Sequence, residues 1–311
     1  MTPVLPLYGH DRAEAAFLAA LSSGRMHHAW LVEGPSGIGK ARFALRLAAY
    51  LLGARGPASA PLDAPADDTV MRRVLAGSHP DLSLKKREPN DKGKLAQDIT
   101  VEQARELTQF FTLKPAMGGW RIGIVDAMDE ANRNAANALL KTLEEPPPQC
   151  LLILLNHGTQ PLLPTIRSRC RTLRLSPLNE ADSARAMEAA GIPADAAMLA
   201  RGRPGLALRL SAPAALSAAS AARAFVKALP RADDRTVTAA LSAASAGPDA
   251  QEAFRTVVLD WVAVRAAQDM RAAGVWLRLA RLCGEAETLN MDAAQVSAKL
   301  IAGVQEAAKS G

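Results

Sequence analysis

One short glycine-rich segment constrains the fold of this chain more than any other feature. Residues 29–33 form an apolar run, residues 34–40 read Gly-Pro-Ser-Gly-Ile-Gly-Lys, and apolar residues then recur at helical spacing up to residue 51. A strand, a glycine loop and a helix in this order match the phosphate-binding P-loop pattern G-x-x-x-x-G-K. The pattern predicts a parallel α/β sheet whose candidate nucleotide-binding residues are Gly34, Pro35, Ser36, Gly37, Ile38, Gly39 and Lys40.

Two groups that ATP hydrolysis needs are missing from this predicted site. The P-loop pattern continues with Ser or Thr, which ligates Mg²⁺, but residue 41 is Ala. A second buried-strand pattern ends at Asp126, which is placed to help hold a metal ion. The next position carries a glutamate in active ATPases of this class and is Ala127 here. We therefore predict weak binding of ATP or ADP without turnover.

Three alternatives remain open at this stage. The segment 34–40 could be a glycine-rich turn that only joins a strand to a helix. Asp126 could be a carboxylate that caps a loop at the end of a strand. Asp129 and Glu130 follow so closely that a small change of register would let one of them orient the attacking water.

Strand and helix patterns alternate up to about residue 177. Apolar runs at 121–126, 150–155 and 171–175 predict strands, and helical spacing is found at 11–22, 100–111 and 132–145, the last ended by three prolines. Alternation of this kind predicts a parallel sheet covered on both faces. From residue 177 onward only helical patterns occur, and residues 85–94 are predicted to form an exposed basic excursion.

Composition narrows the classes of function. The chain is 49% apolar and 22% charged, which excludes a disordered protein. Aromatic residues make up 4%, too few for a base-stacking platform. The net charge of +6 permits contact with a polyanion through two basic runs, although such runs are usually solvated faces. These runs are Lys85, Lys86, Arg87, Lys92 and Lys94, and Arg167, Arg169, Arg171 and Arg174. The start of the chain resembles no signal peptide and no apolar run reaches membrane-spanning length, so we expect a cytoplasmic protein that contacts no membrane.

Two long motifs carry a family resemblance. Residues 137–147, Asn-Ala-Leu-Leu-Lys-Thr-Leu-Glu-Glu-Pro-Pro, and residues 162–170, Leu-Leu-Pro-Thr-Ile-Arg-Ser-Arg-Cys, resemble the AAA+ subunits of bacterial clamp loaders. The segments 28–31, 79–81 and 99–105 are similar to the delta-prime branch of the DNA polymerase III family rather than to its ATP-hydrolysing gamma/tau branch.

This resemblance implies an organisation and a role. It implies an AAA+ α/β domain over residues 1–177, a small helical lid over 178–211 and an all-α collar domain over 212–311. It further implies a non-hydrolysing subunit that assembles with delta and gamma/tau and helps load the sliding clamp on primed DNA. The clamp would be contacted indirectly, through the complex.

The resemblance also assigns site residues. Arg169, with Ser168 and Cys170 of the same motif, matches the segment whose arginine enters the ATP site of a neighbouring subunit. The alternative is that Arg169 forms a structural ion pair. In the lid segment 202–208, Gly205 stands where active members carry a sensing arginine, with Arg203 as the less favoured candidate. The resemblance would also allow a zinc module with four cysteines between the phosphate loop and the segment 79–81. Residues 51–78 contain no cysteine, so we expect this chain to bind no zinc.

A different class of function remains as a second reading. In it the chain is a self-sufficient AAA+ P-loop ATPase, such as a helicase loader or a remodelling motor, which uses Lys40 and Asp126 for its own hydrolysis. Ala41 and Ala127 argue against this reading, because a motor needs the groups that these positions lack.

Overall fold

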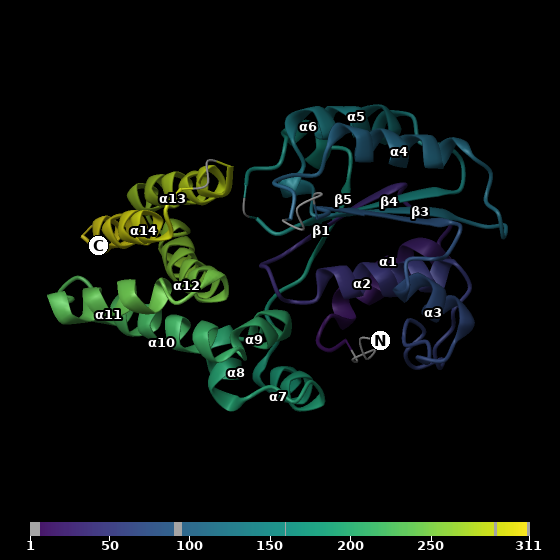
Figure 1. Cartoon of the computed structure of the whole chain (residues 1–311). Coiled ribbons are helices and arrows are strands. Elements are labelled where there is room, and N and C mark those ends of the chain that lie inside the picture. The colour runs from purple at the N-terminus through teal and green to yellow at the C-terminus, as the bar shows by residue number, and fades with distance from the viewer. Residues whose placement is uncertain (1–6, 90–94, 159, 289–290, 310–311) are drawn as a thin grey trace. The chain divides into compact units, whose positions relative to one another are not determined.

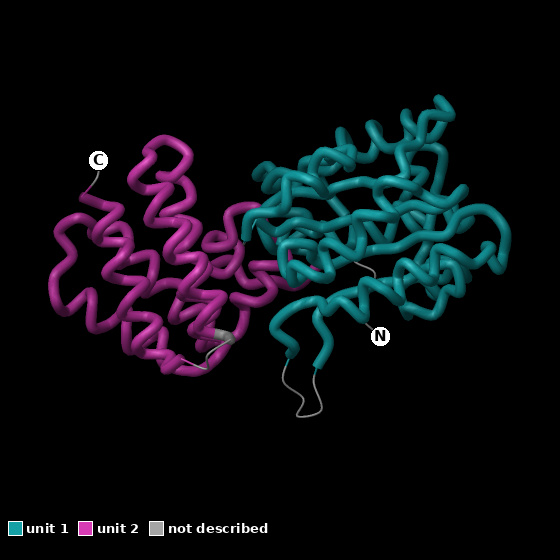
Figure 2. Tube along the Cα trace, turned by 90° about the horizontal axis from the view of Figure 1, so that it is seen from above, with its two compact units in different colours: residues 1–189 teal, residues 190–311 magenta. Residues whose placement is uncertain are grey.

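The computed structural model describes residues 7–89, 95–158, 160–288 and 291–309 of the 311-residue chain (Figure 1). The chain divides into two compact units, residues 1–189 and residues 190–311 (Figure 2). The three-part organisation with boundaries at 177 and 211 stays a prediction. No helix within the described residues has the length and apolar character needed to cross a membrane.

The described residues of the first unit contain a five-stranded sheet in which every paired strand runs parallel, in the order β2-β3-β4-β1-β5. The predicted α/β class with a parallel sheet is therefore confirmed. The strands are β1 (Ala29–Glu33), β2 (Leu82–Lys86), β3 (Arg121–Asp126), β4 (Cys150–Asn156) and β5 (Arg171–Arg174).

Strand β2 corrects the prediction of an exposed excursion over residues 85–94. Lys85 and Lys86 belong to this strand, which pairs with β3 at the edge of the sheet. An edge strand tolerates charged side chains because one of its sides faces solvent. Residues 90–94 of the predicted excursion, including Lys92 and Lys94, lie outside the described residues.

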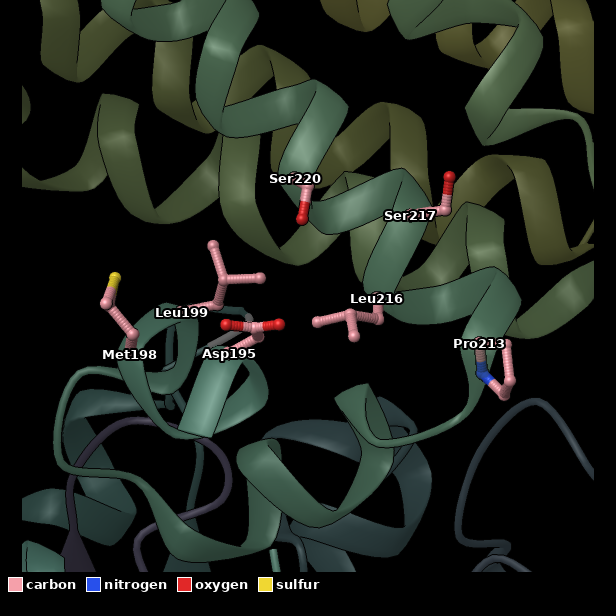
Figure 3. A pocket seen from close by; sticks show the side chains of 7 residues that line it. All are labelled: Asp195, Met198, Leu199, Pro213, Leu216, Ser217 and Ser220. Atoms are coloured by element: carbon pink, nitrogen blue, oxygen red, sulfur yellow. The ribbon is translucent and has the colours of Figure 1, made fainter. Parts of the chain in front are cut away.

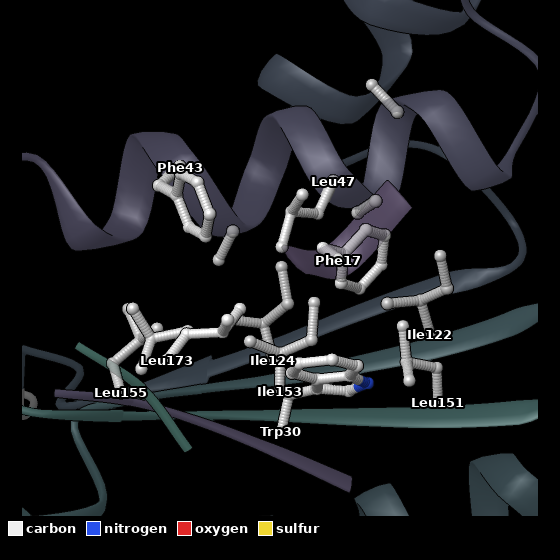
Figure 4. Packing of buried hydrophobic residues seen from close by; sticks show 14 of the residues in the cluster. Phe17, Trp30, Phe43, Leu47, Ile122, Ile124, Leu151, Ile153, Leu155 and Leu173 are labelled. Atoms are coloured by element: carbon white, nitrogen blue, oxygen red, sulfur yellow. The ribbon is translucent and has the colours of Figure 1, made fainter. Parts of the chain in front are cut away.

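Helices cover both faces of the sheet. One face carries α1 (Asp11–Ser22), α2 (Lys40–Leu51) and α3 (Thr69–Leu75), and the other carries α4 (Val101–Thr112), α5 (Arg133–Glu144) and α6 (Pro164–Arg167) (Figure 1). Trp30 and Val32 of β1 pack on the first face, where Figure 4 shows Trp30 beneath Phe17, while Leu31 packs on the second. Strands buried on both faces explain why the sequence shows continuous apolar runs.

Local signals fix the helix ends on the second face. Thr100 and Gln103 form a capping box at the start of α4, and the side chain of Asn132 caps α5. The prolines after α5 stop it, and His28 Nε2 lies 2.9 Å from the carbonyl oxygen of Leu143 in its last turn. The histidine thus satisfies a carbonyl that the helix cannot satisfy itself.

The first unit ends with α7 (Glu180–Ala189), and the described residues of the second unit form only helices. These are α8 (Ala194–Ala200), α9 (Pro204–Leu210), α10 (Pro213–Ala228), α11 (Asp234–Ala244), α12 (Pro248–Ala266), α13 (Met270–Thr288) and α14 (Ala293–Ala308). The helices enclose an apolar core that contains the fully buried side chains of Phe225, Phe254 and Leu300. The all-helical C-terminal half predicted from the sequence is confirmed.

Close packing at Gly123 of β3 generates a stability prediction. A Cβ atom there would lie 2.7 Å from atoms of both Leu107 and Phe111, which are buried. We expect Gly123→Ala to lower the free energy of unfolding by about 1–3 kcal/mol, measured by urea unfolding followed by circular dichroism.

Gly274 of α13 provides the control, because a Cβ atom there would meet open space. Gly274→Ala is expected to leave the free energy of unfolding unchanged or raise it by up to about 1 kcal/mol. Equal effects of the two substitutions would contradict the packing argument.

Candidate functional site

The loop between β1 and α2 has the backbone conformation that its glycines predicted. Gly34, Gly37 and Gly39 have φ values of +152°, +86° and +100°, which side-chain-bearing residues rarely adopt. Gly39 is the N-cap of α2 and has no side chain to accept the first amide groups of the helix. These amides and the positive end of the helix dipole make the loop suitable for an anion such as a phosphate group.

Lys40 is turned onto its own loop. Its Nζ donates hydrogen bonds to the carbonyl oxygens of Gly34 and Pro35 at 2.5 and 2.9 Å, and the residue is only 3% exposed. These two bonds hold the ammonium group against the loop.

His10 contacts the phosphate loop at Ile38. The residue is buried, and its Nε2 lies 3.0 Å from the carbonyl oxygen of Ile38. Burial lowers the pKa of His10, because desolvation disfavours the charged imidazolium. The neutral ring therefore anchors the loop through a single hydrogen bond.

The parallel register brings polar residues together at the carboxyl edge of the sheet. Lys86 of β2 pairs with Asp126 of β3, and Glu33 of β1 pairs with Asn156 of β4 on one side and with Arg174 of β5 on the other. Each of these residues ends its strand. The predicted strand end at Asp126 is thus confirmed, and it lies on the same edge as the phosphate loop.

Glu33 and Asn156 are residues that sequence reasoning missed. Asn156 Nδ2 donates to Glu33 Oε1 at 3.1 Å, and Arg167 Nη2 forms an ion pair with the same oxygen at 2.6 Å. Arg174 Nε lies 3.8 Å from the other Glu33 oxygen. The sequence does contain a signal for them, because each is a polar residue at the end of a buried apolar run. The ends of parallel strands meet at one edge of a sheet, so such residues are candidates for the same site.

Asp126 is paired with a histidine. Its Oδ1 lies 3.4 Å from His157 Nε2, with each side chain about one-fifth exposed. The adjacent Ala127 is fully buried. His157 follows Asn156 directly and was not singled out from the sequence.

The two acids after Asp126 are also occupied. Asp129 Oδ1 accepts a hydrogen bond from the backbone amide of His157 at 3.0 Å, and Glu130 forms an ion pair with Arg87 at 2.9 Å. Burial raises the pKa of Glu130, and the nearby Arg87 opposes that rise. Both acids lie in the short 3-10 turn Met128–Glu130 that follows β3.

Arg169 lies between α6 and β5 and binds groups of its own chain. Its Nη2 forms an ion pair with Glu144 at 2.8 Å, and its Nη1 donates to the carbonyl oxygen of Thr165 at 2.9 Å. Ser168 Oγ donates to the same carbonyl at 3.2 Å. Burial raises the pKa of the Cys170 thiol to about 12, so this thiol stays protonated near neutral pH. The role of Arg169 in a neighbouring site stays a prediction.

Several described residues of the two basic runs have partners within the chain. Lys85 binds Glu106 at 2.6 Å, and Arg171 stacks over the ring of Trp30 at 4.9 Å. Together with the ion pairs of Arg87, Arg167 and Arg169, these contacts use much of the positive charge inside the chain. Among the described members of the two runs, Lys86 is exposed, and the side chain of Arg174 is 82% exposed.

The His-Pro-Asp segment at 79–81 braces the fold. The fully buried carboxylate of Asp81 accepts hydrogen bonds from the amides of Ala116 and Met117 at 2.7 and 2.9 Å. The backbone amide of Asp81 in turn donates a hydrogen bond to His79 Nδ1 at 3.2 Å. These contacts hold the loop before β3, which is a structural role.

In the second unit, Arg203 is bound to a neighbouring helix. The residue is 6% exposed, its Nε donates to the Ala200 carbonyl oxygen at 3.1 Å, and it forms an ion pair with Asp260 of α12. Gly205 lies in the first turn of α9. The less favoured candidate for a sensing arginine is therefore engaged within its own unit.

The cysteine-free segment 51–78 is held in part by contacts with α2. Arg46 of α2 donates to the Leu62 carbonyl oxygen at 3.2 Å and forms an ion pair with Asp63. Among the residues that the structure describes, no three His, Cys, Asp or Glu side chains are grouped to hold a metal ion. The expectation of no zinc stays a prediction.

A pocket of about 420 Å³ lies between α8 and α10 of the second unit (Figure 3). Its lining contains one acid and two hydroxyl groups among apolar side chains, and it includes none of the predicted site residues. The lining residues are Asp195, Met198, Leu199, Pro213, Leu216, Ser217 and Ser220.

A family model matches a segment that lies within the first unit. The family described as DNA polymerase III, delta subunit, matches residues 9–179. The delta' subunit of DNA polymerase III from Pseudomonas aeruginosa is 41% identical over 143 residues, which cover 46% of this chain and 41% of that protein.

Two further relatives cover similar shares. The gamma subunit of DNA polymerase III from Buchnera aphidicola subsp. Schizaphis graminum is 32% identical, covering 57% of this chain and 46% of the relative. The delta' subunit from Bacillus subtilis is 33% identical, covering 51% of this chain and 45% of the relative. The chain thus spans less than half the length of these relatives.

The buried His10 generates a prediction on pH. Because the unfolded chain binds the proton near the ordinary pKa of 6.5 and the folded chain binds it less tightly, protonation favours unfolding. The free energy of unfolding should fall as pH drops below 6.5, by at most about 1.4 kcal/mol per pH unit for this one proton.

The matched variant is His10→Gln, whose amide can still donate to the Ile38 carbonyl but does not titrate. Urea unfolding between pH 5 and 7 should give a flatter pH dependence for this variant than for the wild type. Identical slopes would contradict the role of His10.

Proposed function

The chain belongs to the family described as DNA polymerase III, delta subunit, and on this premise we propose that it is the delta-prime subunit of a bacterial clamp loader. One observation carries the proposal beyond the family. The phosphate loop keeps its left-handed glycines and Lys40, yet Ala41 and Ala127 stand where hydrolysis needs a hydroxyl and a carboxylate. This combination favours a non-hydrolysing member over the gamma/tau subunits.

In this role the chain assembles with delta and gamma/tau and helps place the sliding clamp on primed DNA during replication. The clamp and the DNA are contacted through the complex, and the protein acts in the cytoplasm. Residues 1–177 serve as the AAA+ domain, residues 178–211 as the lid and residues 212–311 as the collar.

ATP or ADP binds weakly at residues 34–40 in this proposal. The loop amides and the N-terminus of α2 fit phosphate oxygens without any side chain at position 41. Binding is weak in this proposal because Ala41 lacks the hydroxyl group that would ligate Mg²⁺ beside the phosphates.

Arg169 acts on the nucleotide of a neighbouring subunit. A guanidinium group is always charged and planar and has five N–H donors, so the contacts with Glu144 and Thr165 do not exhaust it. The remaining donors suit the charge that develops on γ-phosphate oxygens in the transition state. Glu144 orients the group from the end of α5.

Reconstitution with delta and gamma/tau tests the proposal. The chain should enter a stable complex with them, seen by size-exclusion chromatography, and Arg169→Ala should assemble equally well. Arginine fingers contribute on the order of 10³ to 10⁵ in rate at one site. Because only one of several sites depends on Arg169, DNA-stimulated ATPase of the whole complex should fall partly.

Arg167→Ala is the matched control, because Arg167 also forms an ion pair within the chain but is not the arginine that the family resemblance assigns to the neighbouring site. Its ATPase rate should stay closer to the wild type than that of Arg169→Ala. Failure to assemble would contradict the clamp-loader role. Intact assembly with unchanged ATPase and clamp loading in Arg169→Ala would contradict only the trans-acting role.

The isolated chain is expected not to hydrolyse ATP, because positions 41 and 127 lack the metal-binding hydroxyl and the water-orienting carboxylate. Phosphate release by the purified protein should equal that of Lys40→Ala. Steady turnover that Lys40→Ala abolishes would instead favour a self-sufficient AAA+ ATPase.

A further inference from the structure

We propose that His157, and not a divalent cation, is the partner of Asp126, so that nucleotide binding to this chain does not depend on Mg²⁺. The inference rests on the proposed nucleotide site and adds the identity of the group beside its acidic strand end. It starts from the 3.4 Å approach of His157 Nε2 to Asp126 Oδ1.

The backbone around His157 is held by two side-chain acceptors. Its own amide donates to the buried Asp129 at 3.0 Å, and the following amide of Gly158 donates to Asn156 Oδ1 at 3.0 Å. The turn after β4 therefore fixes the backbone from which His157 reaches Asp126.

The remaining carboxylates at this edge of the sheet also have protein partners. Glu130 is paired with Arg87 at 2.9 Å, and Glu33 is bound by Arg167 at 2.6 Å and by Asn156 at 3.1 Å. Positive charge and N–H donors of the chain thus satisfy the acids that a cation would otherwise use.

The residues present do not fit Mg²⁺ on chemical grounds either. This ion demands near-octahedral oxygen ligands, and an imidazole nitrogen beside Asp126 does not supply one. Position 41, at the start of α2, offers a methyl group in place of a ligating hydroxyl. Restoring the hydroxyl and removing the imidazole should therefore create a role for the cation.

The test measures ADP affinity by isothermal titration calorimetry in excess EDTA and in excess Mg²⁺. The proteins are the full-length wild type, the double variant Ala41→Thr/His157→Ala and the control His27→Ala. His27 is another partly buried histidine, and its Nδ1 lies 2.8 Å from the carbonyl oxygen of Ala29, the first residue of β1. Wild type and control should show less than about a threefold effect of Mg²⁺, and the double variant a gain of about tenfold or more.

Each other outcome is decisive. Wild-type binding that requires Mg²⁺ overturns the inference and leaves the proposed nucleotide site standing. A double variant that is insensitive to Mg²⁺, or that binds no nucleotide, also overturns it. If only the double variant binds, and only with Mg²⁺, the natural chain has no nucleotide site, and the inference falls together with the proposed nucleotide binding. Assembly with delta and gamma/tau is decided separately by the reconstitution.

Discussion

Every paired strand of this sheet runs parallel, so every strand ends at the same edge. Hydrogen bonding between β3, β4 and β1 alone is enough to bring Asp126, Asn156 and Glu33 into one row beside the glycine loop. The buried faces of the sheet hold these strands in place, because Trp30 and Leu31 of β1 pack on opposite layers of helices. The candidate site depends on this arrangement, and no single side chain creates it.

Charge at this edge is balanced within the chain. Asp126 faces His157, Glu33 faces Arg167, and Glu130 faces Arg87, while Lys40 is bound by carbonyl oxygens of its own loop. In an active phosphoryl-transfer site such groups would instead be available to a metal ion and to phosphates. Charged groups that are paired within the chain in this way stabilise the fold around the site and are not available for catalysis.

The segment around Arg169 is also bound by groups of its own chain. Arg169 is bound to Glu144 and to the Thr165 carbonyl on the face covered by α5 and α6, whereas Lys40 belongs to the helix layer on the opposite face. The chain therefore carries its phosphate loop and its candidate trans-acting arginine on different layers of one sheet. In the proposed function this arginine serves a neighbouring subunit and not the loop of its own chain.

The sequence by itself determined the strands around 29–33, 121–126 and 150–155, the left-handed glycines of the loop, and the absence of working groups at positions 41 and 127. These features are local, since they follow from residue type, spacing and backbone preference. Only the tertiary structure decided the pairings of His157 with Asp126 and of Asn156 with Glu33, and it also placed Lys85 and Lys86 in a strand. Asn156 and Glu33 are separated by 123 positions in the chain. Their contact depends on strand order and register, which arise from the packing of the whole sheet and leave no signature in either segment alone.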